Sequence, residues 1–191
     1  MLRKRIALLA GDGIGPEVVA EAVKVLRAVE KHSAVSFDFK EAPVGAKAIH
    51  ETGNPLPDET LQLCKSSDAV LFGAIGSPEF DNNPNAKVRP EQGLLKLRKE
   101  LGLFANIRPV KTFKSLRHLS PLKEEIVRNV DFVVFRELTG GIYFGKKELS
   151  EDKKHATDVC SYSEYEIARI AKLAFEEIGR ASCRERVYVL V

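Results

Sequence analysis

Three arginines and one tyrosine are the residues in this sequence whose chemistry fits the binding of a small carboxylate and the transfer of a proton. They are Arg98, Arg108, Arg136 and Tyr143. A guanidinium presents a planar fork of donors that matches a carboxylate with two hydrogen bonds. A phenol can donate a proton when a nearby cation lowers its pKa. Taken singly, each arginine also fits a solvated surface position, and the tyrosine also fits a packing role.

The segment that contains Arg98 has the spacing of an amphipathic helix over about 91–101. Glu91, Leu95 and Arg98 fall at positions i, i+4 and i+7 and share one face. Leu94 lies at the border between this face and the apolar face that we expect to pack on the core. An anion-binding fork beside an apolar patch suits a branched substrate with carboxylates, whereas a solvated Glu/Arg pair is the alternative that the helix alone leaves open.

A glycine-rich segment, Gly11–Glu17, lies between an apolar run and a predicted helix. Its spacing is G-x-G-x-G-P and therefore does not match the dinucleotide fingerprint G-x-G-x-x-G. Three glycines at such a junction still let a ligand approach the backbone closely. The alternative is a tight turn whose glycines need positive φ, and for Asp12 a turn or capping role is sufficient.

The elements that must position these residues alternate between strands and helices, which predicts a parallel α/β sheet. Apolar or alternating runs predict strands at 5–10, 35–40, 68–75, 106–110, 131–137 and, after a sharp bend at Gly140-Gly141, 142–145. Helical spacing predicts a helix that begins near Pro16 and further helices at 59–66, 91–101, 122–128 and 163–178, with Asp58 as the cap of the second. Residues 76–90 are expected to form a loop, and 146–162 a protruding hairpin.

The composition is that of an ordinary globular protein, with 44% hydrophobic and 30% charged residues. The 30 basic and 27 acidic residues are interspersed, which argues against nucleic acid as a partner. The three cysteines, Cys64, Cys160 and Cys183, have neither disulfide nor zinc spacing, and the four histidines lie far apart. No segment has the length of a membrane span or the pattern of a signal peptide, and we expect a cytoplasmic protein.

Five blocks in one order carry a resemblance to a known family: Gly11–Glu17, Leu71–Gly76, Arg89–Leu101, Leu103–Pro109 and Arg136–Gly145. Together, over about residues 3–178, they resemble the isocitrate and isopropylmalate dehydrogenases, which are β-decarboxylating enzymes. The resemblance implies an α/β fold of two domains with a shared central sheet, present here in truncated form. Residues 1–101 would begin the NAD-side domain, and 102–178 would begin the substrate and dimerisation domain, with the hairpin near 146–162 as its arm.

Leu94 and Leu95 favour the isopropylmalate branch, because isocitrate-specific relatives carry polar residues here and an apolar pocket rejects a charged substituent. The resemblance then implies NAD-dependent oxidative decarboxylation of 3-isopropylmalate to 4-methyl-2-oxopentanoate in leucine biosynthesis, with Mg or Mn as the metal. The alternatives are a tartrate, homoisocitrate or isocitrate dehydrogenase, or a non-catalytic fragment that binds or dimerises.

By resemblance, Arg98, Arg108 and Arg136 bind the malate carboxylates and hydroxyl, and Tyr143 is the catalytic tyrosine. The resemblance also implies a set of NAD-binding residues: Ile14, Gly73, Ala74, Gly76, Pro78 and Glu91. The cofactor loop departs from the family pattern, since 76–80 reads Gly-Ser-Pro-Glu-Phe where Gly-Gly-Pro-Lys-Trp is expected. Contacts to the nicotinamide are therefore expected to differ in detail.

Several functional parts of the family are expected beyond residue 178: the lysine partner of the tyrosine, the metal-binding aspartates and the adenine loop. The lysine and one aspartate reach across a homodimer interface in the family. Residues 179–191 lack periodicity, and reverse translation of about 177–187 is compatible with a sequencing adapter, so we expect a non-native tail there; a genuine variable C-terminus is the alternative. We therefore expect this chain alone to lack dehydrogenase activity.

Overall fold

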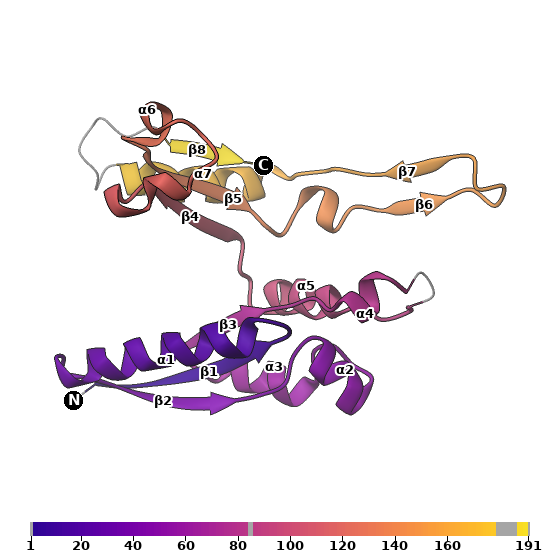
Figure 1. Ribbon diagram of the computed structural model, residues 1–191. Coiled ribbons are helices and arrows are strands. Elements are labelled where there is room, and N and C mark those ends of the chain that lie inside the picture. The colour runs from indigo at the N-terminus through magenta and orange to yellow at the C-terminus, as the bar shows by residue number, and fades with distance from the viewer. Residues whose placement is uncertain (1, 84–85, 179–186, 191) are drawn as a thin grey trace. The chain divides into compact units, whose positions relative to one another are not determined.

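The computed structural model describes residues 2–83, 86–178 and 187–190. The chain divides into two compact units, Met1–Leu101 and Gly102–Val191 (Figure 1). Each unit contains a sheet and helices, so the fold is mixed α/β. Within the part of the chain that is described, no helix is both long enough and apolar enough to cross a membrane.

The first unit is built on a parallel sheet with the strand order β2-β1-β3. Its strands are β1 (Leu2–Gly11), β2 (Val35–Glu41) and β3 (Ala69–Ala74). The central strand is buried on both faces, which explains its continuous apolar run. Ala7 and Leu9 point into a core formed with Leu61 and Leu97, while Ile6 is buried on the opposite face.

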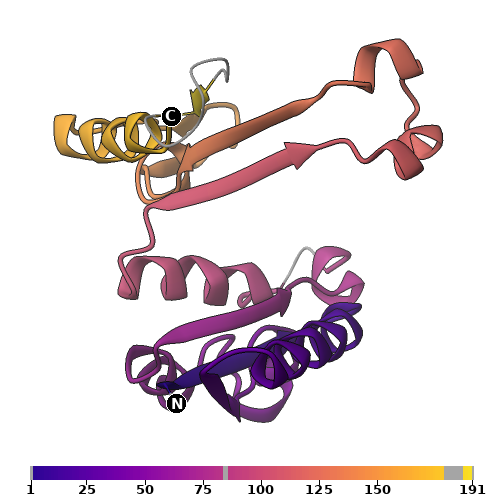
Figure 2. The ribbon, with the colours of Figure 1, turned by 90° about the vertical axis from the view of Figure 1, so that its left-hand side faces the viewer.

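Helices cover both faces of this sheet. The described helices of this unit are α1 (Gly15–Lys31), α2 (Ala46–Thr52), α3 (Asp58–Lys65), α4 (Pro78–Asp81) and α5 (Pro90–Glu100). α1 runs alongside the strands in both views (Figures 1 and 2). Val19 of α1 packs so closely on β3 that a Cβ at Gly73 would lie 2.9 Å from its Cγ2. Leu61 of α3 and Leu97 of α5 belong to the core on the other face of β1.

The second unit contains a mixed sheet with the strand order β4-β5-β8. Its strands are β4 (Ala105–Lys111), β5 (Asp131–Glu137) and β8 (Val187–Leu190); β4 and β5 are antiparallel, and β5 and β8 are parallel. α7 (Glu164–Ile178) covers one face, where Phe135 is fully buried against Ile170 and Ala174. This small apolar cluster is the core of the second unit.

The remaining elements of the second unit are short. They are η1 (Lys114–Leu119), α6 (Glu124–Val127), η2 (Gly141–Tyr143), β6 (Lys147–Leu149) and β7 (Ala156–Asp158). β6 and β7 pair in antiparallel fashion and form the predicted hairpin, which extends away from β5 and α7 (Figure 1).

Three predictions about local structure were wrong, and one helix was missed. The strand expected over 142–145 is a 3₁₀ turn, because Gly141 takes a positive φ of 67° and its carbonyl accepts the N–H of Gly145. Asp58 does not cap α3; Pro57 occupies the N-cap position, and the Asp58 carboxylate pairs with Lys96 Nζ at 3.3 Å. The loop at 76–90 contains α4, and α2 was not predicted at all.

Two further expectations concern the sheet and the C-terminal tail. The strands that are described form one three-stranded sheet in each unit, in which β3 pairs with β1 and β4 pairs with β5. The expected non-native tail falls largely on 179–186 and 191, which lie outside the described residues. The backbone of 187–190 forms β8.

Candidate functional site

The carboxyl ends of β1 and β3 meet at the same edge of the first sheet. From β1 the chain continues through α1 to β2 on one side, and β3 then pairs with β1 on the other side. Such a reversal of strand order leaves a crevice at the carboxyl edge, which is where open α/β sheets bind ligands. The glycine-rich loop after β1 and the segment Gly73–Gly76 both lie at this point.

The glycines of the first loop are required by its geometry. Gly11 has a φ of 75°, and a Cβ there would overlap the carbonyl oxygen of Ala74. A Cβ at Gly15 would lie 2.9 Å from the Ala74 nitrogen. The tight-turn interpretation is therefore confirmed for this loop. Gly13 differs, because it has a φ of 56° but no neighbouring atom within 4 Å.

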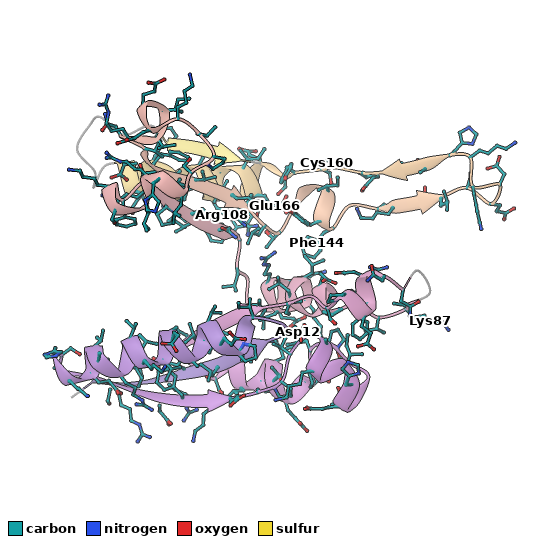
Figure 3. All side chains as sticks on the ribbon, viewed as in Figure 1. Asp12, Lys87, Arg108, Phe144, Cys160 and Glu166 are labelled. Atoms are coloured by element: carbon teal, nitrogen blue, oxygen red, sulfur yellow. The ribbon has the colours of Figure 1, made fainter. Side chains whose placement is uncertain are left out.

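Asp12 ties three segments together at this edge (Figure 3). It is 7% exposed, and its backbone N–H donates to the carbonyl of Ala74 at 2.7 Å. Its carboxylate accepts the backbone N–H groups of Ala46 (2.9 Å), Lys47 (3.2 Å) and Gly76 (3.2 Å). The Asp12 carboxylate thus accepts N–H groups at the N-terminus of α2 and from Gly76, and these distant partners were not predicted.

The candidate cofactor residues are gathered in this first unit. Ile14 is the N-cap residue of α1 and is 62% exposed. Gly76 has a φ of 130°, and a Cβ there would lie 3.4 Å from the Glu91 carboxylate, so these two residues are neighbours. Pro78 opens α4. Gly73 and Ala74 have structural roles in the packing of β3 against α1 and the loop after β1.

α5 carries the candidate residues that would read the substrate. Pro90, Gly93 and Leu97 form its buried side, and a Cβ at Gly93 would lie 2.6 Å from the Pro55 carbonyl oxygen. Leu94, Leu95 and Arg98 are all half-buried. Leu94 was expected at the border of the core face. It directly follows the buried Gly93 in α5, and its half-buried side chain fits this border position.

His50 makes a contact that the sequence did not predict. Its Nε2 lies 3.1 Å from a carboxylate oxygen of Glu79, and its ring centroid lies 5.7 Å from that of Phe80. These contacts link α4 to α2 at the surface. Glu79 and Phe80 are two of the positions at which the cofactor loop departs from the family pattern.

In the second unit, Arg136 and Tyr143 lie together. The guanidinium carbon of Arg136 is 5.1 Å from the centroid of the Tyr143 ring, which is a cation–π geometry. Tyr143 was expected on a strand but lies at the end of η2. The turn folds the tyrosine back toward the strand that carries the arginine.

Arg108 shares a sheet face with Arg136. In the antiparallel register Asn106 is opposite Arg136 and Arg108 is opposite Val134, so all four side chains project on one side. Arg108 and Arg136 are thus diagonal neighbours, and such pairs lie about 7–8 Å apart in general. The Asn106 side chain accepts a hydrogen bond from Arg108 Nε at 2.9 Å and holds its guanidinium.

A buried carboxylate next to Arg136 was also missed. The Glu137 side chain is 0% exposed and accepts the backbone N–H groups of Thr139 (2.7 Å) and Gly140 (2.8 Å). Arg169 Nη2 donates to it at 2.8 Å. Burial raises the pKa of Glu137, but hydrogen bonds from the Thr139 hydroxyl and the two backbone N–H groups, together with Arg169, outweigh it and lower the pKa below the ordinary value of 4.5. Sequence offered one signal, an acidic residue inside an apolar strand.

The predicted substrate residues are therefore divided between the units. Arg98, Leu94 and Leu95 belong to the first, whereas Arg108, Arg136 and Tyr143 belong to the second. Their convergence on one ligand stays a prediction. Among the residues described, no group of three or more His, Cys, Asp or Glu side chains is placed to hold a metal ion.

Comparison with known proteins identifies the family. Residues 5–191 match the profile described as isocitrate/isopropylmalate dehydrogenase. The chain is 55% identical over 172 residues to the 3-isopropylmalate dehydrogenase of Bacteroides fragilis, covering 90% of this chain and 48% of the relative. It is 49% identical over 179 residues to that of Aquifex aeolicus, covering 92% and 49%.

Solved structures agree with this sequence similarity. An isocitrate dehydrogenase from Methylococcus capsulatus has a TM-score of 0.75 at 29% identity, covering 96% of this chain and 49% of its own. A β-decarboxylating dehydrogenase from Thermococcus kodakarensis has a TM-score of 0.63 at 37% identity, covering 93% and 46%. The chain thus spans about half the length of the relatives that it matches. It belongs to the isocitrate/isopropylmalate dehydrogenase family.

Proposed function

We propose that the full-length protein corresponding to this chain catalyses the NAD-dependent oxidative decarboxylation of 3-isopropylmalate to 4-methyl-2-oxopentanoate, a step of leucine biosynthesis in the cytoplasm. The observation that carries the proposal is the identity of 55% to a 3-isopropylmalate dehydrogenase over nine-tenths of the chain. The half-buried pair Leu94 and Leu95 supports the choice of substrate. An apolar surface favours a branched alkyl group and disfavours the additional carboxylate of isocitrate, because an unpaired charge is costly to bury.

In this proposal, three guanidinium groups bind the malate part of the substrate. Arg108 and Arg136 share one face of β4 and β5, which supports a joint role in binding a dicarboxylate. Arg98, on α5, is assigned to the same ligand. A bidentate guanidinium fixes both the position and the orientation of a carboxylate, so the reacting carbon is held in one place.

Tyr143 is assigned as the donor of the proton that takes the place of the departing carboxylate. Its ring lies against Arg136 in a cation–π geometry, and a phenol held in one place can donate a proton to a bound ligand. NAD supplies the hydride acceptor when bound, and Ile14, Gly73, Ala74, Gly76, Pro78 and Glu91 are assigned to hold it. The open space beside Gly13 and the proximity of Gly76 to Glu91 fit close approach of a cofactor to this backbone.

The reaction also needs a divalent cation, Mg or Mn, for which the described residues provide no cluster of ligands. We therefore assign the metal ligands to the half of the relatives' length that this chain does not span, and derive no step through them here. The proposal includes a homodimer for the full-length protein. For the chain of 191 residues alone it predicts no turnover.

Two alternatives remain distinct in their consequences. The first alternative is a related β-decarboxylating dehydrogenase that acts on tartrate, homoisocitrate or isocitrate and shares the fold. The similarity to a solved isocitrate dehydrogenase supports this alternative. A non-catalytic fragment that binds or dimerises would keep NAD binding or self-association without turnover.

The test is an assay of NADH formation with Mg and each of the four acids, for this chain and for the full-length gene product. We expect the full-length protein to prefer 3-isopropylmalate and this chain to remain at the buffer blank. Preference for isocitrate would refute the substrate assignment, and turnover by this chain would refute the claim that it is inactive. Light scattering and NAD titration of the chain test the fragment alternative, and sequencing the gene past codon 178 shows whether metal-binding aspartates follow.

A further inference from the structure

The turn between β5 and the hairpin carries Tyr143, and it is fixed at its start by one carboxylate. Glu137 Oε2 accepts the N–H groups of Thr139 (2.7 Å) and Gly140 (2.8 Å). The Thr139 hydroxyl donates to Glu137 Oε1 at 2.7 Å. A carboxylate that gathers three donors from consecutive residues imposes one conformation on their backbone.

The same carboxylate is tied to α7 by Arg169. Nη2 of Arg169 lies 2.8 Å from Glu137 Oε1 and also donates to the Thr139 hydroxyl. The Arg169 guanidinium lies between two aromatic rings, 4.7 Å from the centroid of Phe104 and 5.0 Å from that of Tyr165. The arginine is thus held by packing as well as by charge, and it anchors the turn to the helix that forms the core.

The other side of the turn packs against the returning chain. The N–H of Gly141 donates to the carbonyl of Ser161 at 2.9 Å, and the ring of Tyr162 occupies the space that a side chain at Gly141 would need. The turn is therefore fixed on two sides, and Tyr143 is directed toward Arg136.

Arg136 and Glu137 are consecutive in β5, so their side chains point to opposite faces of the sheet. Glu137 contacts the start of the turn and Arg169 of α7, whereas Arg136, on the other face, contacts the Tyr143 ring. We propose that Glu137 and Arg169 are positioning residues: the ion pair between the buried Glu137 and the part-buried Arg169 holds the turn so that the Tyr143 ring stays against Arg136. The inference rests on the proposed function in that Tyr143 is taken as the proton donor, but the contact is measurable without turnover.

The experiment uses this chain with ¹³C-labelled tyrosine rings and assigns Tyr143 by comparison with Tyr143→Phe. The nuclear Overhauser effect between the Tyr143 ring and the Arg136 δ-methylene protons is followed from about pH 8 to about pH 5. In the wild type we expect a constant signal, because Glu137 stays ionised throughout. In Arg169→Met, which keeps the apolar stem and removes the charge, the buried carboxylate loses its cation. The turn then loses its link to α7, and the signal should be about two-fold or more weaker than in the wild type at every pH of this range.

Lys172→Met is the matched control, because Lys172 is an exposed residue on the same helix, 78% exposed, and should leave the signal unchanged. Thr139→Val is the milder variant: it removes the hydroxyl that bridges the ion pair but keeps the charges, and it should change the Tyr143 ring shifts. If Arg169→Met gives wild-type signals at every pH, the proposal is overturned. If that variant fails to fold, unchanged Tyr143 signals in Thr139→Val overturn it. A full-length enzyme without activity on 3-isopropylmalate would refute the proposed function and leave this result intact.

Discussion

The carboxylate of Asp12 accepts the backbone N–H of Gly76 at 3.2 Å, which joins the loop after β1 to the loop after β3. Because the same carboxylate also accepts two N–H groups at the start of α2, it fixes the carboxyl edge of the first sheet. Ile14, Gly73, Ala74 and Gly76, four of the residues that we assign to NAD, lie at or next to this edge.

Asp12→Ala should therefore destabilise the first unit by about 3 kcal/mol, since it leaves buried N–H groups without an acceptor. Asp12→Asn keeps one acceptor oxygen and should cost less. Urea denaturation measures the loss, and hydrogen exchange should be faster at the Gly76 amide. Glu21→Gln, at an exposed position of α1, is the control and should change stability by less than about 0.5 kcal/mol. Equal exchange at Gly76 in Asp12→Ala and wild type would contradict the assignment.

Two glycines of the same loop should respond differently to alanine. Gly11→Ala combines a left-handed φ of 75° with overlap on the Ala74 carbonyl, and should cost more than about 3 kcal/mol. Gly13→Ala meets no atom within 4 Å and should cost only the backbone strain, about 1–2 kcal/mol. Denaturant unfolding of the two variants under the same conditions is the measurement. A larger loss for Gly13→Ala would show that the loop has another conformation.

Glu137 should make stability depend on pH in the acid range. Its pKa is lowered below 4.5 in the folded chain, so its contribution to the free energy of unfolding is complete above about pH 4.5. The contribution is lost as the pH falls through the folded pKa. In Glu137→Gln the free energy of unfolding should be lower at pH 7 by about 3–5 kcal/mol, because Arg169 loses its buried partner, and the difference should shrink at low pH. Glu176→Gln, in an exposed pair on α7, should show no such convergence.

Replacing Leu94 by Ser and Leu95 by Asn in the full-length protein should lower kcat/KM for 3-isopropylmalate by about 10- to 100-fold, because the alkyl branch loses apolar contact. The ratio of kcat/KM between isocitrate and 3-isopropylmalate should rise. Lys96→Ser, at an exposed position between Leu95 and the buried Leu97, is the control. An unchanged ratio would remove these leucines from the substrate site.

The local order of the chain was largely determined by the sequence. Continuous apolar runs can be buried only as strands or helices, and the glycines at 11–15 indicate a tight turn between a strand and a helix. The sequence therefore predicted the first strand, the turn and the first helix. The amphipathic helices at 91–101 and 163–178 were likewise predicted, because a spacing of three to four residues places apolar side chains on one face. The family followed from five ordered blocks, and comparison with known proteins confirmed it.

Only the tertiary structure decided which polar groups meet. The donors to Asp12 are 34, 35 and 64 residues away in sequence, and Arg169 is 32 residues from Glu137. No local pattern specifies such partners, because they are brought together by the packing of helices on sheets. The strand predicted over 142–145 was wrong because distant residues determine the conformation of this segment, which is the turn that carries Tyr143. Its conformation is imposed by a carboxylate and an aromatic ring that contact it in the folded second unit.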